Sequence, residues 1–326
     1  MLATVERSVC LTCGSGSHQL YPALSDDLYN APGTWTVVRC SNPVCRLVWL
    51  DPAPHPDSLI ELYKDYFTHG GEADWRGWKS RLRSAHQATE DCLLAPFGIA
   101  AERRRAKAMF LTGDPPATLL DVGCGDGALL KTMSDRGWTV TGIDFDAAAV
   151  AGIRERLGLE AHVGTALSMV ASGRKFDVVA ASHVIEHVSD PVRFLADCAQ
   201  LLKRGGRVIV RTPNADSIGH SLFGRSWRGL EPPRHLFVFT RPSLIACGGK
   251  AGLKAESCVT TDANAGPILA ISHFLRRYGR YRLDWLSKLQ ILKWMVISPA
   301  YALRARLSMW RDDASGEELH AIFRAP

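Results

Sequence analysis

Short apolar runs alternate with amphipathic stretches through the middle of this chain. Residues 118–122, 139–143, 176–181 and 207–211 each have the length and apolar content of a buried strand. The stretches between them place apolar side chains at helical spacing. Strands that alternate with helices in this way predict a parallel α/β sheet covered by helices.

One of these helices is marked at both ends. Asp190 is a suitable capping residue, Pro191 fits the first helical position, and apolar side chains then recur on one face as far as Leu202. Gly205-Gly206 predicts the end of this helix, because a left-handed residue is common there. Near the end of the chain we expect residues 318–324 to form a last strand, since a turn at Ser315-Gly316 precedes them.

The same pattern divides the chain into five regions. Residues 1–55 form a small module that carries two cysteine pairs, 56–112 a helical linker or lid, and 113–263 the α/β core. Residues 264–314 are a basic, amphipathic helical insertion, and 315–326 return to the core as its final strand.

Positive charge is concentrated in the insertion. The 326-residue chain has a net charge of +6, yet residues 273–311 alone hold nine Arg or Lys and one acid, Asp284. The longest uncharged stretch there, 294–303, is far short of the ~20 apolar residues that span a bilayer. The first residues lack the basic and apolar pattern of a signal peptide. We therefore expect a cytoplasmic protein.

The Trp, Arg and apolar residues of 273–311 fit three uses. They suit a helix at the inner face of a membrane, a site for a phosphorylated or lipid-linked substrate, or a helix whose apolar face packs on the core. Binding to nucleic acid is disfavoured, because the remainder of the chain is slightly acidic.

A glycine-rich turn, Asp121-Val-Gly-Cys-Gly-Asp-Gly127, follows the first predicted strand. Glycine permits a tight turn and lets a ligand approach the backbone. The spacing is G-x-G-x-G, whereas dinucleotide enzymes have G-x-G-x-x-G. Asp144 ends the next strand, where a carboxylate can accept both hydroxyls of a ribose. These features fit an adenosine cofactor with a sulfonium amino acid better than one with a pyrophosphate, so they disfavour a nicotinamide oxidoreductase.

The stretch from Leu119 to Leu253 resembles the class I S-adenosylmethionine-dependent methyltransferases. It carries Leu120-Asp-Val-Gly-Cys-Gly-Asp-Gly127, Gly142-Ile-Asp-Phe-Asp146, Phe176-Asp-Val-Val179, His183-Val-Ile-Glu-His187, Leu202-Lys-Arg-Gly-Gly206 and Thr212-Pro-Asn214. The resemblance implies S-adenosyl-L-methionine as cofactor. It also implies an α/β fold with a Rossmann-like, seven-stranded sheet, here with a small N-terminal four-cysteine module and a helical insertion before the last strand.

The resemblance further implies contacts to the cofactor. The glycine loop would lie along the methionine part, Asp144 would hold the ribose, and Phe145 would pack on the adenine. Thr165 stands where the family often has an acidic residue that contacts the adenine amino group. The full set of expected cofactor contacts is Asp121, Gly123, Cys124, Gly125, Asp144, Phe145, Thr165, Ser182 and His183.

Two cysteine pairs mark the N-terminal module. Cys10 and Cys13 form one, and Cys40 and Cys45 form the other. Tetrahedral zinc takes four thiolates from two such knuckles, so we expect a structural Zn²⁺ site. The module and core together resemble methyltransferases of sugars and other small metabolites. In the sugar C-methyltransferases of that group a Tyr-His-Glu-His segment supplies the base, and only His235 matches it here.

Methyl transfer to a hydroxyl benefits from a base, and histidine suits neutral pH. His235 is the leading candidate, because its loop is long enough to reach the active site. His187 is the second. Each of these histidines also has a purely structural alternative, in which His235 would hydrogen-bond only within its own loop and His187 would brace the start of a helix. Glu186 would orient the cofactor loop or cap that helix.

We expect S-adenosylmethionine-dependent methyl transfer to a small-molecule acceptor, by O-methylation. A sugar, a glycolipid or a secondary metabolite would fit. Two alternatives stay open. One is a methyltransferase of RNA or protein, in which the zinc module grips the macromolecule, and the other is a cofactor-binding protein without catalysis.

Overall fold

The computed structural model describes residues 2–59, 89–281 and 288–325. Its centre is a seven-stranded sheet with the order β12-β13-β10-β9-β6-β7-β8. Strand β13 is antiparallel to both of its neighbours, and the remaining pairs are parallel. The strands are β6 (Thr118–Val122), β7 (Thr139–Asp144), β8 (Ala161–Val163), β9 (Phe176–Ser182), β10 (Leu202–Pro213), β12 (Lys254–Thr261) and β13 (Glu318–Arg324).

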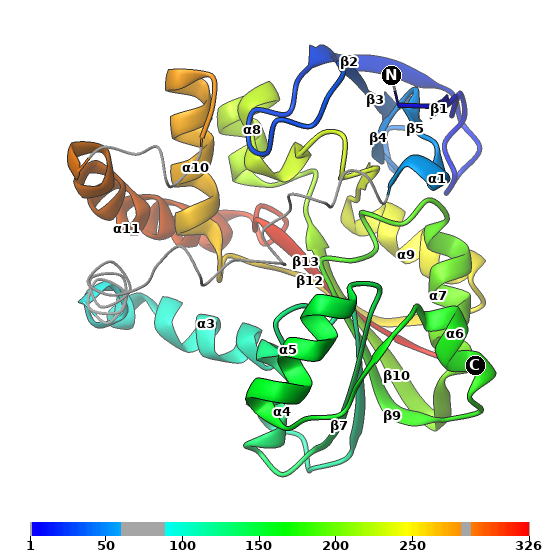
Figure 1. Cartoon of the computed structure of the whole chain (residues 1–326). Helices are drawn as coiled ribbons and strands as arrows, with labels where there is room; N and C mark the ends of the chain where they lie inside the picture. The colour runs from blue at the N-terminus through cyan, green and yellow to red at the C-terminus, as the bar shows by residue number, and fades with distance from the viewer. Residues whose placement is uncertain (1, 60–88, 282–287, 326) are drawn as a thin grey trace.

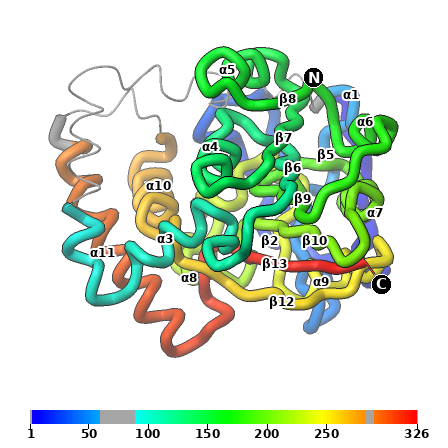
Figure 2. The backbone as a smooth tube through the Cα atoms, turned by 90° about the horizontal axis from the view of Figure 1, so that it is seen from below, coloured from blue at the N-terminus to red at the C-terminus, as the bar shows by residue number. Residues whose placement is uncertain are grey.

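Helices cover both faces of this sheet (Figures 1 and 2). The face with α3 (Ile99–Lys107), α4 (Ala128–Ser134) and α5 (Ala147–Leu157) buries one apolar cluster, and the face with α6 (Ala166–Ala171), α7 (Pro191–Gln200) and α9 (Arg241–Lys250) buries another. Adjacent residues of a strand point to opposite faces, so Val178 of β9 belongs to the first cluster and Val179 to the second.

The N-terminal module has a sheet of its own with the order β11-β4-β3-β2. Its strands β2 (Ser17–Leu24), β3 (Trp35–Cys40) and β4 (Val48–Leu50) come from the module, but β11 (Phe237–Val238) comes from the core. The short β1 (Thr4–Val5) and β5 (Ala53–Pro54) pair beside it, before α1 (Pro56–Leu59). Apolar residues of this sheet and of the α6, α7 and α9 face form one continuous cluster.

The remaining helices lie beside the core. They are η4 (Ala95–Phe97), α8 (Ile218–Phe223), η5 (Gly224–Ser226), η6 (Arg228–Leu230), α10 (Ala265–Tyr278) and α11 (Lys288–Arg311). Helices α10 and α11 pack against each other before β13, where the sequence predicts a helical insertion. Among the described residues, none of the helices is long and apolar enough to cross a membrane. The predicted helical linker falls in part on residues 60–88, which lie outside the described residues.

The predicted strands are confirmed, and so is the Asp190 cap, which accepts a hydrogen bond from the backbone N–H of Arg193 at 2.9 Å. The predicted end of α7 is wrong. The helix stops at Gln200, and Leu202 already pairs with Phe176 of β9. Gly205-Gly206 lies in β10 instead, where the register shifts. A Cβ on Gly206 would come within 3.1 Å of two carbonyl oxygens of β9, so this close approach explains the glycine.

Candidate active site

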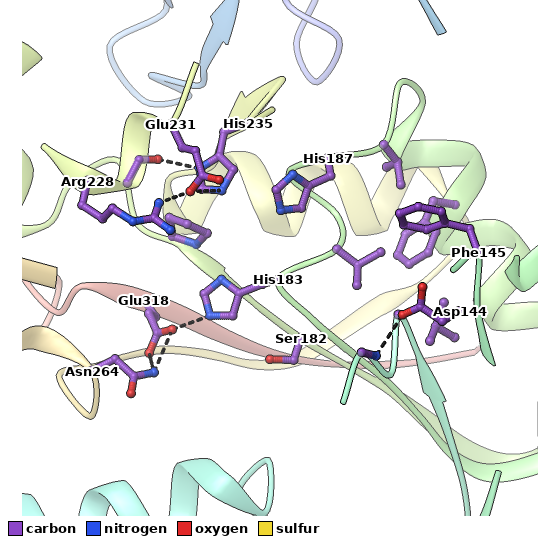
Figure 3. Close-up of a pocket in the computed structure, with 18 of the residues that line it drawn as sticks. Asp144, Phe145, Ser182, His183, His187, Arg228, Glu231, His235, Asn264 and Glu318 are labelled. Atoms are coloured by element: carbon purple, nitrogen blue, oxygen red, sulfur yellow. Dashed lines mark hydrogen bonds and ion pairs between the residues drawn. The ribbon is translucent and has the colours of Figure 1, made fainter. Parts of the chain in front are cut away.

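A cavity of about 860 Å³ opens at the carboxyl ends of β6, β7 and β9. Strand order reverses between β6 and β9, and ligands of α/β sheets bind at this switch point. Figure 3 shows two sides of the cavity. Asp144 and Phe145 lie on one side, here named the donor side. Arg228, Glu231 and His235 lie on the other, here named the acceptor side.

The donor side begins with the glycine loop. Gly123 and Gly125 line the cavity and have φ angles of 71° and 51°, which favour glycine. A Cβ on Gly123 would lie 2.5 Å from Cγ2 of Val184, so the backbone has no room for a side chain. The backbone N–H of Gly125 donates to Oδ2 of Asp144 at 2.9 Å. The loop and the end of β7 are therefore held together.

Asp144 and Phe145 provide a carboxylate and an aromatic ring on the donor side of the cavity. The Asp144 carboxylate also accepts a hydrogen bond from the N–H of Asp146 at 3.0 Å, and it lines the cavity. Phe145 is 49% exposed and belongs to the cavity wall, so an aromatic side chain borders the cavity. Both residues, for which the sequence predicts contacts to ribose and adenine, line the cavity.

Two other predicted contacts lie behind the loop. Asp121 and Cys124 are buried and are not among the residues that line the cavity. Burial and the nearby Asp144 raise the pKa of Asp121 to about 8, and Arg211 opposes this. Cys124 packs into the apolar cluster beneath α4. Both residues support the glycine loop from inside.

Thr165 and Ser182 line the cavity but already have partners. The Thr165 hydroxyl accepts the N–H of Ser168 and caps α6. The Ser182 hydroxyl accepts hydrogen bonds from the Arg211 guanidinium at 2.9 and 3.2 Å. Each side chain thus has a fixed orientation at the cavity edge.

His183 lines the cavity and contacts two buried carboxylates, one of which, Glu318, is seen in Figure 3. Its Nδ1 is 3.1 Å from Glu186 and its Nε2 is 2.5 Å from Glu318. Burial opposes the charged ring, but these hydrogen bonds raise the pKa of His183 to about 9. The imidazolium is thus the state at neutral pH, and it joins β9 to β13. Asn264 adds two hydrogen bonds to Glu318.

His235 is buried on the acceptor side. Its Nδ1 lies 2.8 Å from the carbonyl oxygen of Gly229, so Nδ1 carries the hydrogen and the neutral ring leaves Nε2 as an acceptor. Burial, and then the neighbouring His187, lower the pKa of His235 well below its ordinary value. The ring is therefore neutral at pH 7. Oε2 of Glu231 lies 3.7 Å from Nε2.

His187 lies next to His235, with 4.7 Å between the two ring centroids. Its Nδ1 donates to the carbonyl oxygen of Arg234 at 3.1 Å. Burial lowers the pKa of His187 as well. In Figure 3, His187 lies between His235 and Phe145, that is, between the two sides of the cavity.

Comparison with known proteins decides the family. A family model described as a methyltransferase domain matches residues 97–257. The ubiquinone biosynthesis O-methyltransferase of Stutzerimonas stutzeri is 41% identical over 158 residues, which are 45% of this chain and 68% of that protein. The chain belongs to the class I S-adenosylmethionine-dependent methyltransferases.

Other relatives are matched over shorter stretches. The ubiquinone biosynthesis O-methyltransferase of Parvibaculum lavamentivorans is 36% identical over 107 residues, which are 31% of this chain and 42% of that protein. The chain thus spans less than half the length of that relative. Among solved structures, the glycopeptide N-methyltransferase MtfA matches with a TM-score of 0.42 and 14% sequence identity. The match covers 70% of this chain and 90% of MtfA.

The four N-terminal cysteines of this methyltransferase meet at one point. All four sulfur atoms lie within 4.8 Å of one another. The Cys10 and Cys45 sulfurs are 3.6 Å apart, and those of Cys13 and Cys40 are 3.4 Å apart. A tetrahedron with Zn–S bonds of about 2.3 Å has edges of about 3.8 Å, so the cluster has nearly the size of a zinc site.

A second group with ligand atoms within 4.8 Å consists of Glu186, His187 and His235. Glu186 is occupied on both oxygens, with His183 at 3.1 Å and the Thr212 hydroxyl at 2.9 Å. Burial opposes it, but His183 lowers the pKa of Glu186 to about 2. The hydrogen bonds of these three side chains go to other groups, and Glu186 interacts with the two histidines through its charge. Glu186 neither caps α7 nor contacts the glycine loop through these bonds.

Several cavity residues were missed at the sequence level. They come from the loop before β11, from the residue that precedes α10 and from the start of β13, namely Trp227, Arg228, Glu231, Asn264, Glu317 and Glu318. The Glu317 carboxylate accepts hydrogen bonds from the Trp227 indole at 2.9 Å and from the Gly219 N–H at 2.6 Å. Burial raises the pKa of Glu317 to about 7. The available signal was a pair of acids directly before an apolar strand.

Proposed function

We propose that this methyltransferase transfers a methyl group to a hydroxyl oxygen of a small molecule, with His235 as the proton acceptor. One observation carries the proposal. The His235 ring, with its hydrogen held on Nδ1 by Gly229, lines the same cavity as Asp144 and Phe145. A base and a cofactor site in one cavity are what O-methylation needs.

S-adenosylmethionine, when bound, supplies a methyl carbon made electrophilic by its sulfonium. Asp144 would hold the ribose hydroxyls and Phe145 would stack on the adenine. The open space beside Gly125 would accommodate the methionine part. Thr165, Ser182 and His183 would border the cofactor at the cavity edge.

During the transfer, the oxygen–methyl bond forms as the sulfur–methyl bond breaks, and that electron pair stays on sulfur. The hydroxyl proton passes to Nε2 of His235. Glu231 at 3.7 Å and the nearby Glu186 favour the resulting imidazolium by their negative charge. His187 is the second candidate base, and its position next to His235 suits a relay of the proton away from the site.

The cavity wall also bears on the acceptor. Its apolar members on the acceptor side include Pro267, Ile268 and Ile271 from α10. Polar groups gather around Arg228, Glu231 and His235. This distribution favours a hydroxyl on a largely apolar acceptor, such as a secondary metabolite or a glycolipid, over a bare sugar. The O-methyltransferase names of the relatives in ubiquinone biosynthesis agree with this choice.

We further propose that Cys10, Cys13, Cys40 and Cys45 hold a structural Zn²⁺. Four thiolates close the coordination sphere, so the ion would have no open position for chemistry. Metal analysis of the purified protein should give one zinc per chain, and Cys40→Ser should lose it. A chain that purifies without zinc and keeps its thermal stability would contradict this.

The insertion also supports contact with a membrane surface or with a lipid-linked acceptor. Leu292, Val296 and Trp310 of α11 are exposed. Some of the basic residues are engaged inside the protein, since Arg306 lies 2.8 Å from the buried Asp262. Flotation with anionic liposomes at low salt should carry the protein upward, and Leu292→Lys with Val296→Lys should abolish it. Absence of the wild-type protein from the floating fraction would refute the contact.

The test of the main proposal is His235→Gln. Glutamine keeps a hydrogen-bonding side chain but accepts no proton, so turnover should fall by a factor of about 10² to 10⁴. Affinity for S-adenosylmethionine, measured by calorimetry, should stay within twofold of wild type. Turnover is measured by transfer of a labelled methyl group to small-molecule extracts, with RNA and protein fractions in parallel. Wild-type turnover in the variant removes His235 from the chemistry.

A further inference from the structure

The loop that carries His235 is held from two sides. The N–H of Leu236 donates to the carbonyl oxygen of Glu186 in the core at 2.8 Å. The carbonyl oxygen of Leu236 accepts the N–H of Leu50 in the N-terminal module at 3.1 Å. Directly after it, Phe237 of β11 pairs with Trp49 of β4. His235 thus precedes the residues at which the module and the core meet.

A buried ion cluster reinforces this junction. The Arg234 side chain is 1% exposed, and its Nη2 donates to Oδ2 of Asp26 at 2.8 Å. Its Nε donates to Oε1 of Glu231 at 3.1 Å. The guanidinium lies 4.3 Å from the ring centroid of Tyr29. One arginine from the core therefore connects a carboxylate of the module to a carboxylate of the acceptor side.

Asp26 is itself fixed in place. Its Oδ1 accepts the backbone N–H groups of Leu28 and Tyr29 at 3.1 and 3.0 Å. Its Oδ2 accepts that of Ala31 at 2.8 Å in addition to Arg234. The turn after β2 thus presents a rigid, buried carboxylate, because every one of these bonds restricts its rotation.

Arg234 bears on both histidines of the site. It binds Oε1 of Glu231, while Arg228 binds Oε2, the oxygen that lies 3.7 Å from Nε2 of His235. Through its own carbonyl oxygen it accepts the Nδ1 hydrogen of His187. A shift of Arg234 would therefore be felt at both rings.

We propose that Asp26 and Arg234 are positioning residues for His235, so that the N-terminal module completes the acceptor side of the active site. The inference rests on the proposed function, in which His235 accepts the proton. Without the Asp26 carboxylate, the buried guanidinium would draw more strongly on Glu231. Glu231 would then move away from His235 and shift the loop that begins at Gly229, so the Gly229 carbonyl oxygen would no longer hold the ring hydrogen of His235 on Nδ1.

A simpler role for the cluster would be to fasten the module to the core. That role predicts lower stability for Asp26→Asn but an unchanged His235 ring. The two roles separate in ¹⁵N NMR of the full chain with labelled histidine, since ring nitrogen shifts report which nitrogen carries the hydrogen. His235→Gln assigns the signals. Asp27→Asn is the matched control, because it removes one negative charge at the adjacent residue. The Asp27 side chain is exposed and accepts a hydrogen bond from the Ser25 hydroxyl.

In the wild type we expect one His235 form, with hydrogen on Nδ1. Asp26→Asn should replace it by an averaged signal of both ring forms, whereas Asp27→Asn should match the wild type. Arg234→Lys keeps the positive charge but cannot bind Asp26 and Glu231 at the same time, so its His235 signal should resemble that of Asp26→Asn. This variant decides the matter should Asp26→Asn not fold, as judged by circular dichroism.

Two contrary outcomes are distinguishable. A wild-type spectrum with hydrogen on Nε2 of His235 overturns the proposed function and this inference together. The Nδ1 form in the wild type, unchanged in Asp26→Asn and Arg234→Lys, overturns the inference alone. Affinity for S-adenosylmethionine should remain within twofold in all variants, because neither residue lines the donor side.

Discussion

The two sides of the cavity are built in different ways. The donor side comes from one stretch of the chain, the glycine loop and the end of β7, and its shape is largely backbone. The acceptor side is assembled from distant segments, because Arg234 links Glu231, which lies beside His235, to Asp26 of the N-terminal module. A backbone-built site is sensitive to a single methyl group, whereas an assembled site is sensitive to the partners behind it.

The largest effect on cofactor affinity should come from Gly123→Ala on the donor side. The new Cβ would meet Val184 at 2.5 Å and the φ of 71° disfavours it, so the loop must shift. Affinity for S-adenosylmethionine, by calorimetry, should fall about 100-fold, or about 3 kcal/mol. Gly173→Ala is the control, since it has a φ of 72° but open space around it. Equal losses in both would mean that backbone strain, not the clash, matters.

The second effect concerns the junction of the two sides, the His183–Glu318 pair. Glu318→Gln removes one partner of a buried ion pair and should lower the free energy of unfolding by about 3 kcal/mol at pH 6. Because the folded pKa of His183 is raised to about 9, this stabilisation is present below its unfolded pKa near 6.5 and is lost as pH rises through about 9.

The comparison to make is therefore denaturation of wild type and Glu318→Gln at several pH values. The difference in free energy of unfolding between wild type and Glu318→Gln should narrow from pH 6 to pH 10. A gap that stays constant over this range would show that the ring is not an imidazolium in the folded protein.

The third effect concerns the dependence of the acceptor side on the N-terminal module. Removal of the proposed zinc with a chelator should loosen this module and with it the β4–β11 pairing that follows His235. Turnover should fall about 10-fold while affinity for S-adenosylmethionine stays unchanged, and zinc should restore turnover. Parallel loss of both properties would show that the donor side depends on the module too.

The smallest effect should come from Trp227→Phe. The ring volume is mostly kept, but the hydrogen bond to the buried Glu317 is lost, which costs about 1 kcal/mol. The KM for the acceptor should rise a few-fold with little change in kcat. Leu222→Phe, a change at a partly buried residue that does not line the cavity, serves as the control.

This division also explains what could be predicted from the sequence. The glycine loop and Asp144 are close in the chain, so their spacing alone predicts the donor side. His235 could be named as a candidate, but Asp26 lies more than 200 residues away and bears no local motif. Glu318 gains its role only when β13 inserts beside β10.

The fold shows the same limit. Five core strands are predicted, four of them because their apolar runs are buried on both faces and β13 because a turn precedes it. Strand β8 has three residues, and β12 is an edge strand with a mixed burial pattern, so neither has a strong pattern. Gly205-Gly206 was assigned to a helix end, because a glycine required by close approach of β9 looks the same in sequence.

Strand β11 has a consequence beyond catalysis. Two aromatic residues, Phe237 and Phe239, lie in or next to it and are fully buried in the cluster shared with the module. A chain shortened to begin after residue 55 would leave this strand with a bare hydrogen-bonding edge and apolar side chains in water. Such edges pair with other chains, so the shortened protein should form aggregates at concentrations where the longer chain stays dispersed. We therefore expect β2, β3 and β4 to protect the protein from self-association by covering β11.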